Sequence, residues 1–250
     1  MAAGAAGVPV TVRGHSYDFT EDNLLARLKC PHVKRLYMFP HFADRFPGKR
    51  RVMAVPVAYD STRYERHLAK DHGLVLRTCA AKATKGIADF LRVSALCPTK
   101  RFVLLANTVG DGWIKTLREM ARTIGRVELH EDVPNPEAAE WTRLAAIYLD
   151  TSDPDGHSFG MPISVAESMA TGSHVLLRDT VDARCYAKRG ASYYHTPQQA
   201  ADLINKTDMW TVGDWQEASR RAVCAAAEYA DTRSLAPMLE DWRALCCQSL

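Results

Sequence analysis

The stretch GHSFGMPISVAESMATGSHVLLRD, residues 156–179, carries the pattern that decides the fold class. A loop of small and polar residues comes first, a helical pattern runs from Pro162 to Gly172, and a short apolar strand pattern follows at 173–179. A helix that passes directly into a short apolar strand is the repeating unit of α/β proteins. The rest of the chain decides whether this unit stands alone or belongs to a series.

The same alternation recurs from residue 70 to residue 210. Short apolar runs predict strands at 74–80, 101–107, 126–131, 146–151 and 173–179. Apolar residues at helical spacing predict helices at 85–97, 113–125, 135–145, 162–172 and 196–206. We therefore expect an α/β fold with a doubly wound, parallel, Rossmann-like sheet. In such a fold, ligands bind beyond the carboxyl ends of the strands.

The two ends of the chain differ from this central part. Strand patterns at 8–13, 33–39 and 51–58 predict an incomplete N-terminal α/β portion, and a long helical tail is expected from 215 to 245. A sheet this small is expected to leave apolar side chains exposed. The candidates for that surface are Leu24, Leu28, Tyr37 and Phe39.

Composition excludes several classes of protein. Of the 250 residues, 47% are hydrophobic and 24% charged, and the net charge of +3 is too small to indicate nucleic-acid binding. The seven cysteines are odd in number and include no Cys-x-x-Cys pair, which favours reduced intracellular thiols over a disulfide framework or a zinc site. Because neither a signal peptide nor a membrane span is predicted, we expect a cytoplasmic protein, with peripheral attachment to the inner face of the membrane as an alternative.

The loop at 152–161 lies between a predicted strand and a predicted helix, at the ligand edge of the sheet. A helix N-terminus offers unpaired N–H groups to a phosphate, and Gly156 and Gly160 would let the backbone approach a ligand closely. Glu167, one to two turns into the helix, could accept hydrogen bonds from a pair of sugar hydroxyls. The alternative is an ordinary strand–loop–helix connection with a surface glutamate.

The quoted stretch resembles the donor-domain motif of GT-B glycosyltransferases of the retaining, family-4 type. The residues that match this motif in order are Phe159, Gly160, Glu167, Met169, Ala170 and Gly172. The segment 51–64 is similar to the interdomain segment of that family, with Pro56, Asp60 and Tyr64 at the matching places. The segments 74–86, 101–113 and 127–152 are similar to the donor-domain strands and their loops, so the resemblance covers roughly residues 50–205.

The resemblance implies roles for particular residues. Lys85 would contact the donor diphosphate and neutralise charge on the leaving group, where Ala80 replaces an arginine of the family and Lys82 or Arg77 could substitute for it. Glu167 would bind the nucleotide ribose. The segment Ser158, Phe159, Gly160 and Met161 would approach the phosphates or the donor sugar.

Two further positions follow from the same resemblance. The family's first glutamate, which contacts the sugar, corresponds to His157 when Phe159 and Gly160 are aligned, and Asp153 or Asp155 could supply a carboxylate instead. His15 follows a predicted strand, as does a histidine of the acceptor domain that faces the cleft in family members. It is a candidate acceptor-side residue.

The resemblance also implies a domain organisation and an activity. Residues 1–58 would be a remnant of the acceptor-side domain with the interdomain segment, 59–212 the nucleotide-sugar domain, and 213–250 a helical tail that packs back toward the N-terminal part. The expected activity is transfer of a sugar, of the hexosyltransferase type, from a nucleotide-diphosphate sugar to a carbohydrate or glycolipid, with retention and without a metal or other cofactor. The alternatives are a non-catalytic nucleotide-sugar binding module, or subunit of a split enzyme, and a sugar-nucleotide epimerase.

Overall fold

The computed structural model describes residues 10–13, 33–38, 52–55, 58–108, 110, 112–152 and 162–247. The chain divides into two compact units. One consists of Met1–Ala58 with Tyr229–Leu250, and the other of Tyr59–Glu228. Within the described residues, no helix combines the length and the apolar character that a membrane span requires.

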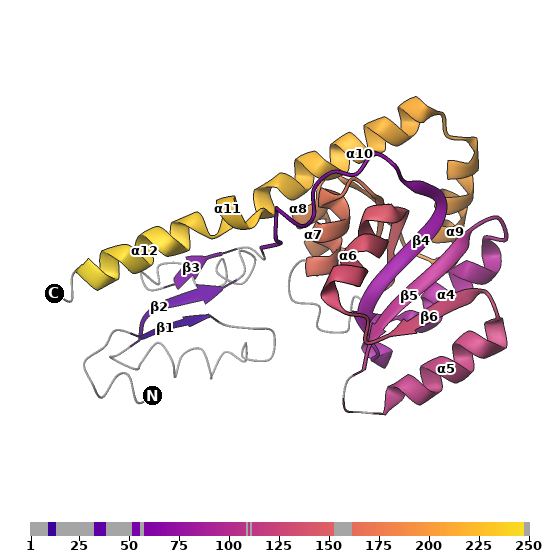
Figure 1. Cartoon of the computed structure of the whole chain (residues 1–250), viewed down its shortest axis with the longest axis horizontal. Helices are drawn as coiled ribbons and strands as arrows, with labels where there is room; N and C mark the ends of the chain where they lie inside the picture. The colour runs from indigo at the N-terminus through magenta and orange to yellow at the C-terminus, as the bar shows by residue number, and fades with distance from the viewer. Residues whose placement is uncertain are drawn as a thin grey trace. The chain divides into compact units, whose positions relative to one another are not determined.

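The larger unit is built on a six-stranded sheet in which every neighbouring pair of strands is parallel. Its strands are β4 (Asp71–Ala80), β5 (Arg101–Asn107), β6 (Val127–Glu131), β7 (Ala145–Asp150), β8 (His174–Arg178) and β9 (Ala191–Tyr194), in the order β6-β5-β4-β7-β8-β9. Figure 1 shows β4, β5 and β6 side by side. The order runs outward from β4 in one direction and from β7 in the other. The carboxyl ends of β4 and β7 therefore form the topological switch point, where doubly wound sheets bind their ligands.

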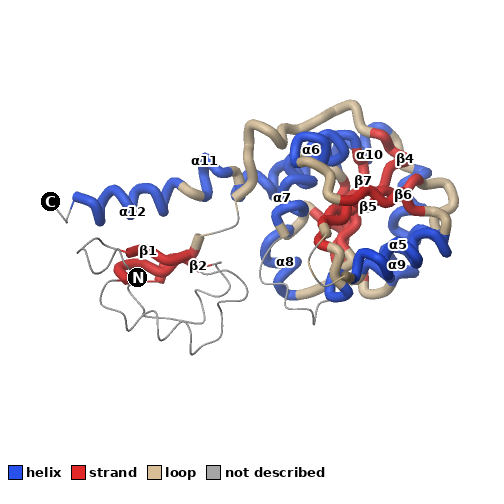
Figure 2. The backbone as a smooth tube through the Cα atoms, turned by 60° about the horizontal axis from the view of Figure 1, so that its bottom comes forward, coloured by secondary structure: helices blue, strands red, loops and turns tan. Residues whose placement is uncertain are grey.

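Helices cover both faces of this sheet (Figure 2). The helices of this unit are α4 (Ile87–Leu96), α5 (Trp113–Ile124), α6 (Asn135–Leu144), α7 (Ile163–Ala170), α8 (Val181–Ala187), α9 (Pro197–Lys206) and α10 (Val212–Ala226). On one face α4 packs against α5 and α9, and on the other α7 packs against α6 and α10. The doubly wound α/β fold expected from the sequence is confirmed.

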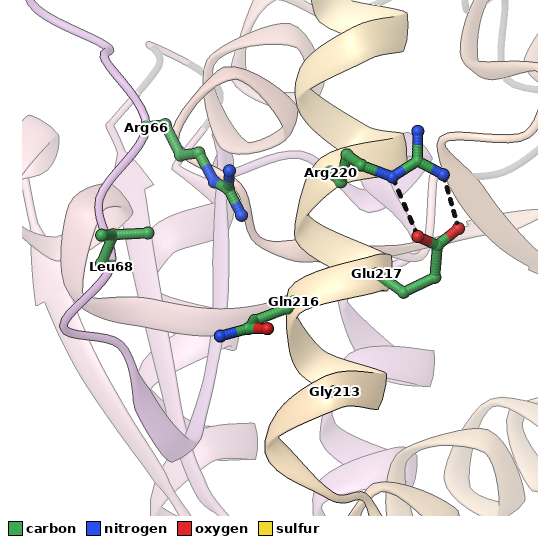
Figure 3. Close-up of a pocket in the computed structure, with 6 residues that line it drawn as sticks. All are labelled: Arg66, Leu68, Gly213, Gln216, Glu217 and Arg220. Carbon is green, nitrogen blue, oxygen red and sulfur yellow. Dashed lines mark hydrogen bonds and ion pairs between the residues drawn. The ribbon is translucent and has the colours of Figure 1, made fainter.

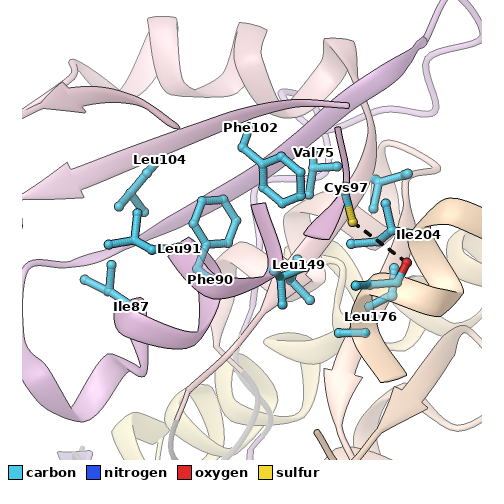
Figure 4. Close-up of a cluster of buried hydrophobic side chains, with 14 of the residues drawn as sticks. Val75, Ile87, Phe90, Leu91, Cys97, Phe102, Leu104, Leu149, Leu176 and Ile204 are labelled. Carbon is cyan, nitrogen blue, oxygen red and sulfur yellow. Dashed lines mark hydrogen bonds between the residues drawn. The ribbon is translucent and has the colours of Figure 1, made fainter. Parts of the chain in front are cut away.

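The core explains why the strand patterns are continuous rather than alternating. Five consecutive residues of β5 and all six of β7 are buried, because helices cover the sheet on both sides. Phe90 of α4 packs edge-to-face on Phe102 of β5, with ring centroids 5.4 Å apart, and Ile204 of α9 lies in the same cluster (Figure 4). This cluster fixes β4 and β5 as the rigid base of the switch point.

Helix α8 and strand β9 of the larger unit were not expected from the sequence. The single long helix expected at 215–245 is in fact divided. Helix α8 buries only Ala183 and Ala187, so it lacks the large apolar stripe that predicts a helix. Strand β9, ASYY, contains no aliphatic residue beyond alanine. The tail pattern at 215–245 is interrupted after α10 by a 3-10 turn, Ala227–Tyr229, and continues as α11 (Asp231–Ser234) and α12 (Ala236–Cys247).

The smaller unit contains a parallel three-stranded sheet in the order β1-β2-β3, formed by Val10–Arg13, Val33–Met38 and Val52–Ala54. Tyr37 of β2 is only 1% exposed, because it packs with Met238 of α12 and donates a 2.8 Å hydrogen bond to Asp241. Arg35 binds the same carboxylate through Nε at 3.0 Å. The expectation that Tyr37 is exposed is therefore wrong, because α12 covers it; Leu24, Leu28 and Phe39 lie outside the described residues.

Gly172, which follows α7, is required for backbone geometry and for space. Its φ of +85° is unfavourable for other residues, and a Cβ at this position would collide with Ser219 Oγ of α10.

We expect Gly172→Ala to reduce the free energy of unfolding by about 2–4 kcal/mol, measured by urea denaturation. Gly125→Ala is the matched control. Its φ is +66° but its nearest atom, Arg122 O, is 3.9 Å away, so about 1 kcal/mol is expected. Equal losses in the two variants would contradict the steric argument.

Candidate functional site

A buried ion pair joins β4 to β7 at the switch point. Arg77 Nη1 lies 2.9 Å from Asp150 Oδ1, and the two side chains are 1% and 9% exposed. Burial alone would raise the pKa of Asp150, but the Arg77 guanidinium and hydrogen bonds from Ser152 hold it below its usual range. Both charges are therefore present, and they hold the carboxyl ends of the two strands together.

The same arginine anchors the turn that follows β4. Arg77 Nη2 donates to the carbonyl of Lys85 at 2.5 Å, and the Thr151 hydroxyl donates to the carbonyl of Gly86 at 2.7 Å. The turn consists of one 3-10 segment, Ala83–Lys85, and Gly86 in the left-handed conformation, after which α4 begins. Lys82 and Lys85 are thus brought to the switch point, on a turn that is fixed against the end of β7.

The start of α7 is held at the same edge of the sheet. Tyr148 of β7 shares a 2.8 Å hydrogen bond with Ser164 Oγ and donates to the carbonyl of Thr78 at 3.2 Å. Through these contacts the first turn of α7 is tied to β4 as well as to β7. The N-termini of α4 and α7 therefore both lie at the switch point, where their unpaired N–H groups favour an anion.

Glu167, one turn further along α7, is paired with Tyr64. The tyrosine hydroxyl donates a hydrogen bond to the carboxylate, and Tyr64 is 8% exposed. Burial raises the pKa of Glu167 to about 7, although the Tyr64 hydroxyl and the charge of Arg63 act to lower it. A carboxylate retains capacity for further hydrogen bonds beside the one from Tyr64, so Glu167 can bind a ligand hydroxyl when ionised.

The segment before Tyr64 explains why that hydroxyl is well placed. The Asp60 carboxylate accepts hydrogen bonds from the Thr62 hydroxyl at 2.7 Å and from the main-chain N–H groups of Thr62 and Arg63 at 3.0 and 3.1 Å. These bonds close a turn that leads directly into Tyr64. The sequence marked Asp60 and Tyr64 as matching positions, but not Tyr64 as the partner of Glu167.

A second tie joins the ends of β5 and β6 beside the switch point. The Asp132 carboxylate accepts from Thr108 N at 2.6 Å and from Thr108 Oγ1 at 2.7 Å, and Asp132 itself has a φ of +49°. The hydrogen bond from the Thr108 hydroxyl is the main reason that the pKa of Asp132 is lowered. Sequence reasoning missed this pair, for which an aspartate directly after a predicted strand was the available signal.

Several of the site residues expected from the sequence lie outside the described part of the chain. His157, Ser158, Phe159, Gly160 and Met161 lie outside the described residues, as do Asp153, Asp155, Pro56 and His15. Arg77 is not the substitute for the missing arginine, because its two terminal nitrogens bind Leu149 O, Asp150, Lys85 O and Ser152. Lys82 is then the residue that could take the place of the arginine that Ala80 replaces. Among the described residues, no three His, Cys, Asp or Glu side chains are grouped to hold a metal ion.

No protein-family model and no curated protein matches the chain by sequence. Solved structures do match. Anabaena Alr3699/HepE in complex with UDP and glucose has a TM-score of 0.77 at 15% identity, over 97% of this chain and 73% of that one. The same protein in complex with UDP-glucose has a TM-score of 0.72 at 17% identity, over 100% and 74%. The fold is of the GT-B type.

Further matches agree with this fold. Sucrose-phosphate synthase from Thermosynechococcus elongatus has a TM-score of 0.72 at 11% identity, over 94% of this chain and 64% of that chain. The C-terminal domain of the glycosyl transferase group 1 family protein LpcC from Francisella tularensis has a TM-score of 0.55 at 14% identity, over 68% of this chain and 97% of that one. These likenesses confirm the fold expected from the resemblance, whereas the family-4 and retaining assignments stay predictions.

Proposed function

We propose that the chain is a glycosyltransferase of the retaining, family-4 type that takes its sugar from a nucleotide-diphosphate sugar without a metal. The observation that carries the proposal is the turn of Lys82 and Lys85, anchored at the switch point between the N-termini of α4 and α7. Two lysines and two helix N-termini place positive charge where the leaving diphosphate gains negative charge. The likeness to a protein solved with UDP and with UDP-glucose supports the same reading.

Other residues would bind the rest of the donor. The ionised Glu167 accepts hydrogen bonds from the ribose hydroxyls, while Tyr64 fixes its carboxylate. His157, or Asp153 or Asp155, would contact the transferred sugar, and the backbone of 158–161 would approach the phosphates. His15 would lie on the side of a carbohydrate or glycolipid acceptor. In this proposal the donor is the only nucleotide required, and the enzyme works in the cytoplasm or at the inner face of the membrane.

Titration calorimetry with UDP, GDP, ADP and their sugar conjugates tests the proposal, with UDP-glucose as the first donor. We expect one nucleotide to bind, and the double variant Lys82→Ala/Lys85→Ala to bind it about 10–100-fold more weakly, because two charge-assisted contacts to phosphate are lost. Lys115→Ala, on the exposed side of α5, is the matched control and should leave affinity unchanged. Absence of binding to every nucleotide, or equal affinity in the double variant, would contradict the assignment.

A non-catalytic nucleotide-sugar binding module is the second candidate. The observation that favours it is that Arg77 is consumed by internal hydrogen bonds and Ala80 stands where the related enzymes carry an arginine. The leaving group would then be neutralised by lysines alone. An assay for sugar transfer, and for slow donor hydrolysis without acceptor, separates the two. Binding without either reaction supports the module, and turnover supports the enzyme.

A further inference from the structure

A basic cavity lies at the opposite edge of the sheet from the candidate site, near the amino ends of β4, β7 and β8. It has a volume of about 180 Å³ and lies between the segment 66–72 and α10. Its basic lining residues are Arg66, His67, Lys70 and His72, and none of the described residues that line it is acidic. A wider groove of about 490 Å³, between the same segment and α10, shares Arg66, Leu68 and Gln216 with it (Figure 3).

Lys70 is a partly buried ammonium that, within the described residues, is bound only to neutral oxygen atoms. Its Nζ donates to Thr142 O at 3.3 Å, and to Thr171 Oγ1 and Ser173 Oγ at 3.1 Å each. Buried charges in proteins are usually paired with an opposite charge, and this one has no carboxylate partner within the described residues. Burial accordingly lowers the pKa of Lys70 to about 7. An anion in the cavity would supply the missing counter-charge.

Arg66 offers donors that the protein does not use. Its Nε donates to Ser219 Oγ at 3.1 Å, and its two terminal nitrogens bind no other residue in the described part of the chain. Figure 3 shows Arg66, Leu68 and Gln216 on one side of α10, with Glu217 and Arg220 on the other. Glu217 is bound by Arg220 at 2.9 Å, so its carboxylate does not neutralise Arg66.

The rim of the cavity has a different character from its interior. Leu68 and Val212 line it and are 79% and 70% exposed, whereas His72 stacks on Trp215 with ring centroids 4.3 Å apart. A basic interior with an apolar rim suits an oxyanion that carries a small carbon group. Inorganic phosphate carries the negative charge that the basic interior would bind, but it has no carbon group to contact Leu68 and Val212 at the rim.

We propose that this cavity is a second ligand site, which binds the phosphoryl group of a small phosphomonoester. Arg66 and Gln216 donate hydrogen bonds to the phosphoryl oxygens, and the Lys70 ammonium adds positive charge beside them. Leu68 and Val212 contact the carbon part of the ligand. The site lies across the sheet from the turn of Lys82 and Lys85, so its occupation leaves the proposed donor site free.

Calorimetric titration of the full chain tests this site with three probes: glycerol 1-phosphate, inorganic phosphate, and vesicles that contain phosphatidic acid. We expect the phosphomonoester to bind more tightly than inorganic phosphate, and Arg66→Gln to weaken both by about tenfold or more. Lys70→Met should do the same. Lys70→Met removes three hydrogen bonds and could prevent folding. In that case the phosphate affinity of Arg66→Gln still tests the proposal, because Arg66 is exposed. Arg118→Gln, on α5, is the control and should leave affinity unchanged.

Three results would overturn the proposal. The first is phosphate binding that Arg66→Gln leaves unchanged. The second is binding that Lys82→Ala/Lys85→Ala abolishes, since the phosphate would then occupy the donor site. The third is attachment to vesicles without binding of either soluble phosphate, which would make the cavity part of a membrane surface. We expect Arg66→Gln to bind nucleotides as tightly as the wild type, because Arg66 does not belong to the proposed donor site. The two tests can therefore fail independently of each other.

Discussion

Arg77→Met is expected to reduce the free energy of unfolding by about 3–5 kcal/mol, because the Asp150 carboxylate stays buried and loses its partner. The variant also removes the donors to Leu149 O, Lys85 O and Ser152. Urea denaturation followed by circular dichroism at neutral pH measures the loss. Because the Lys82–Gly86 turn is released as well, nucleotide affinity should fall even under conditions where the variant remains folded.

A matched arginine shows whether burial causes this effect. Arg101 and Glu128 form two hydrogen bonds of 2.7 Å, but their side chains are 48% and 46% exposed. Arg101→Met should therefore cost about 1 kcal/mol or less. The double variant Arg77→Met/Asp150→Leu should recover much of the loss, since it leaves no unpaired charge. If Arg77→Met costs no more than Arg101→Met, the buried pair does not stabilise the switch point.

Glu167→Gln is expected to stabilise the protein at pH 8, by about 2 kcal/mol after allowance for solvent screening, and to have little effect at pH 4.5. The folded-state pKa of about 7 lies above the ordinary value of 4.5. The stability that the protonated acid contributes is complete below pH 4.5 and is lost as the pH rises through 7. The neutral amide avoids that loss, so the two unfolding free energies should diverge between these pH values.

The same variant should lose nucleotide affinity. A neutral amide replaces an ionised acceptor for the ribose hydroxyls, which is expected to weaken binding by about 10–100-fold at pH 8. In the wild type, affinity should fall as the pH drops below 7, because Glu167 takes up a proton. Glu119→Gln, on α5, is the control. A gain in stability with unchanged affinity would show that Glu167 is a partly buried acid whose ionisation costs stability and which has no role at the donor site.

The fold could be predicted from the sequence because its strands are buried on both faces. The runs at 101–107 and 145–150 are apolar almost throughout, and because they alternate with helical patterns they indicate a parallel sheet with helices on both faces. Helix α8 and strand β9 were missed since their buried residues are mostly alanine and tyrosine. The N-terminal boundary of β4 was placed too late, because Asp71 and His72 are exposed and polar.

The candidate site could be predicted only in part. A lysine-containing turn and a glutamate on a helix can be found by their spacing, but the contacts that hold them depend on strand order. Arg77 and Asp150 are 73 residues apart and meet because β4 and β7 are neighbours at the switch point. The aromatic position of Tyr64 indicates packing and gives no sign of its hydrogen bond to Glu167. The basic cavity was hidden because a charged stretch such as 61–73 is typical of a solvated surface.

The position of β4 beside both β5 and β7 has a consequence for biosynthesis. As the chain leaves the ribosome, β4 can pair with β5 and then β5 with β6, because these strands follow one another closely. The other edge of β4 must wait until β7, which ends at Asp150, has been made. During that interval the nascent sheet has an open edge, at which the backbone N–H and C=O groups of β4 are unpaired. One edge of β4 therefore stays available for wrong pairing until the ribosome has completed β7.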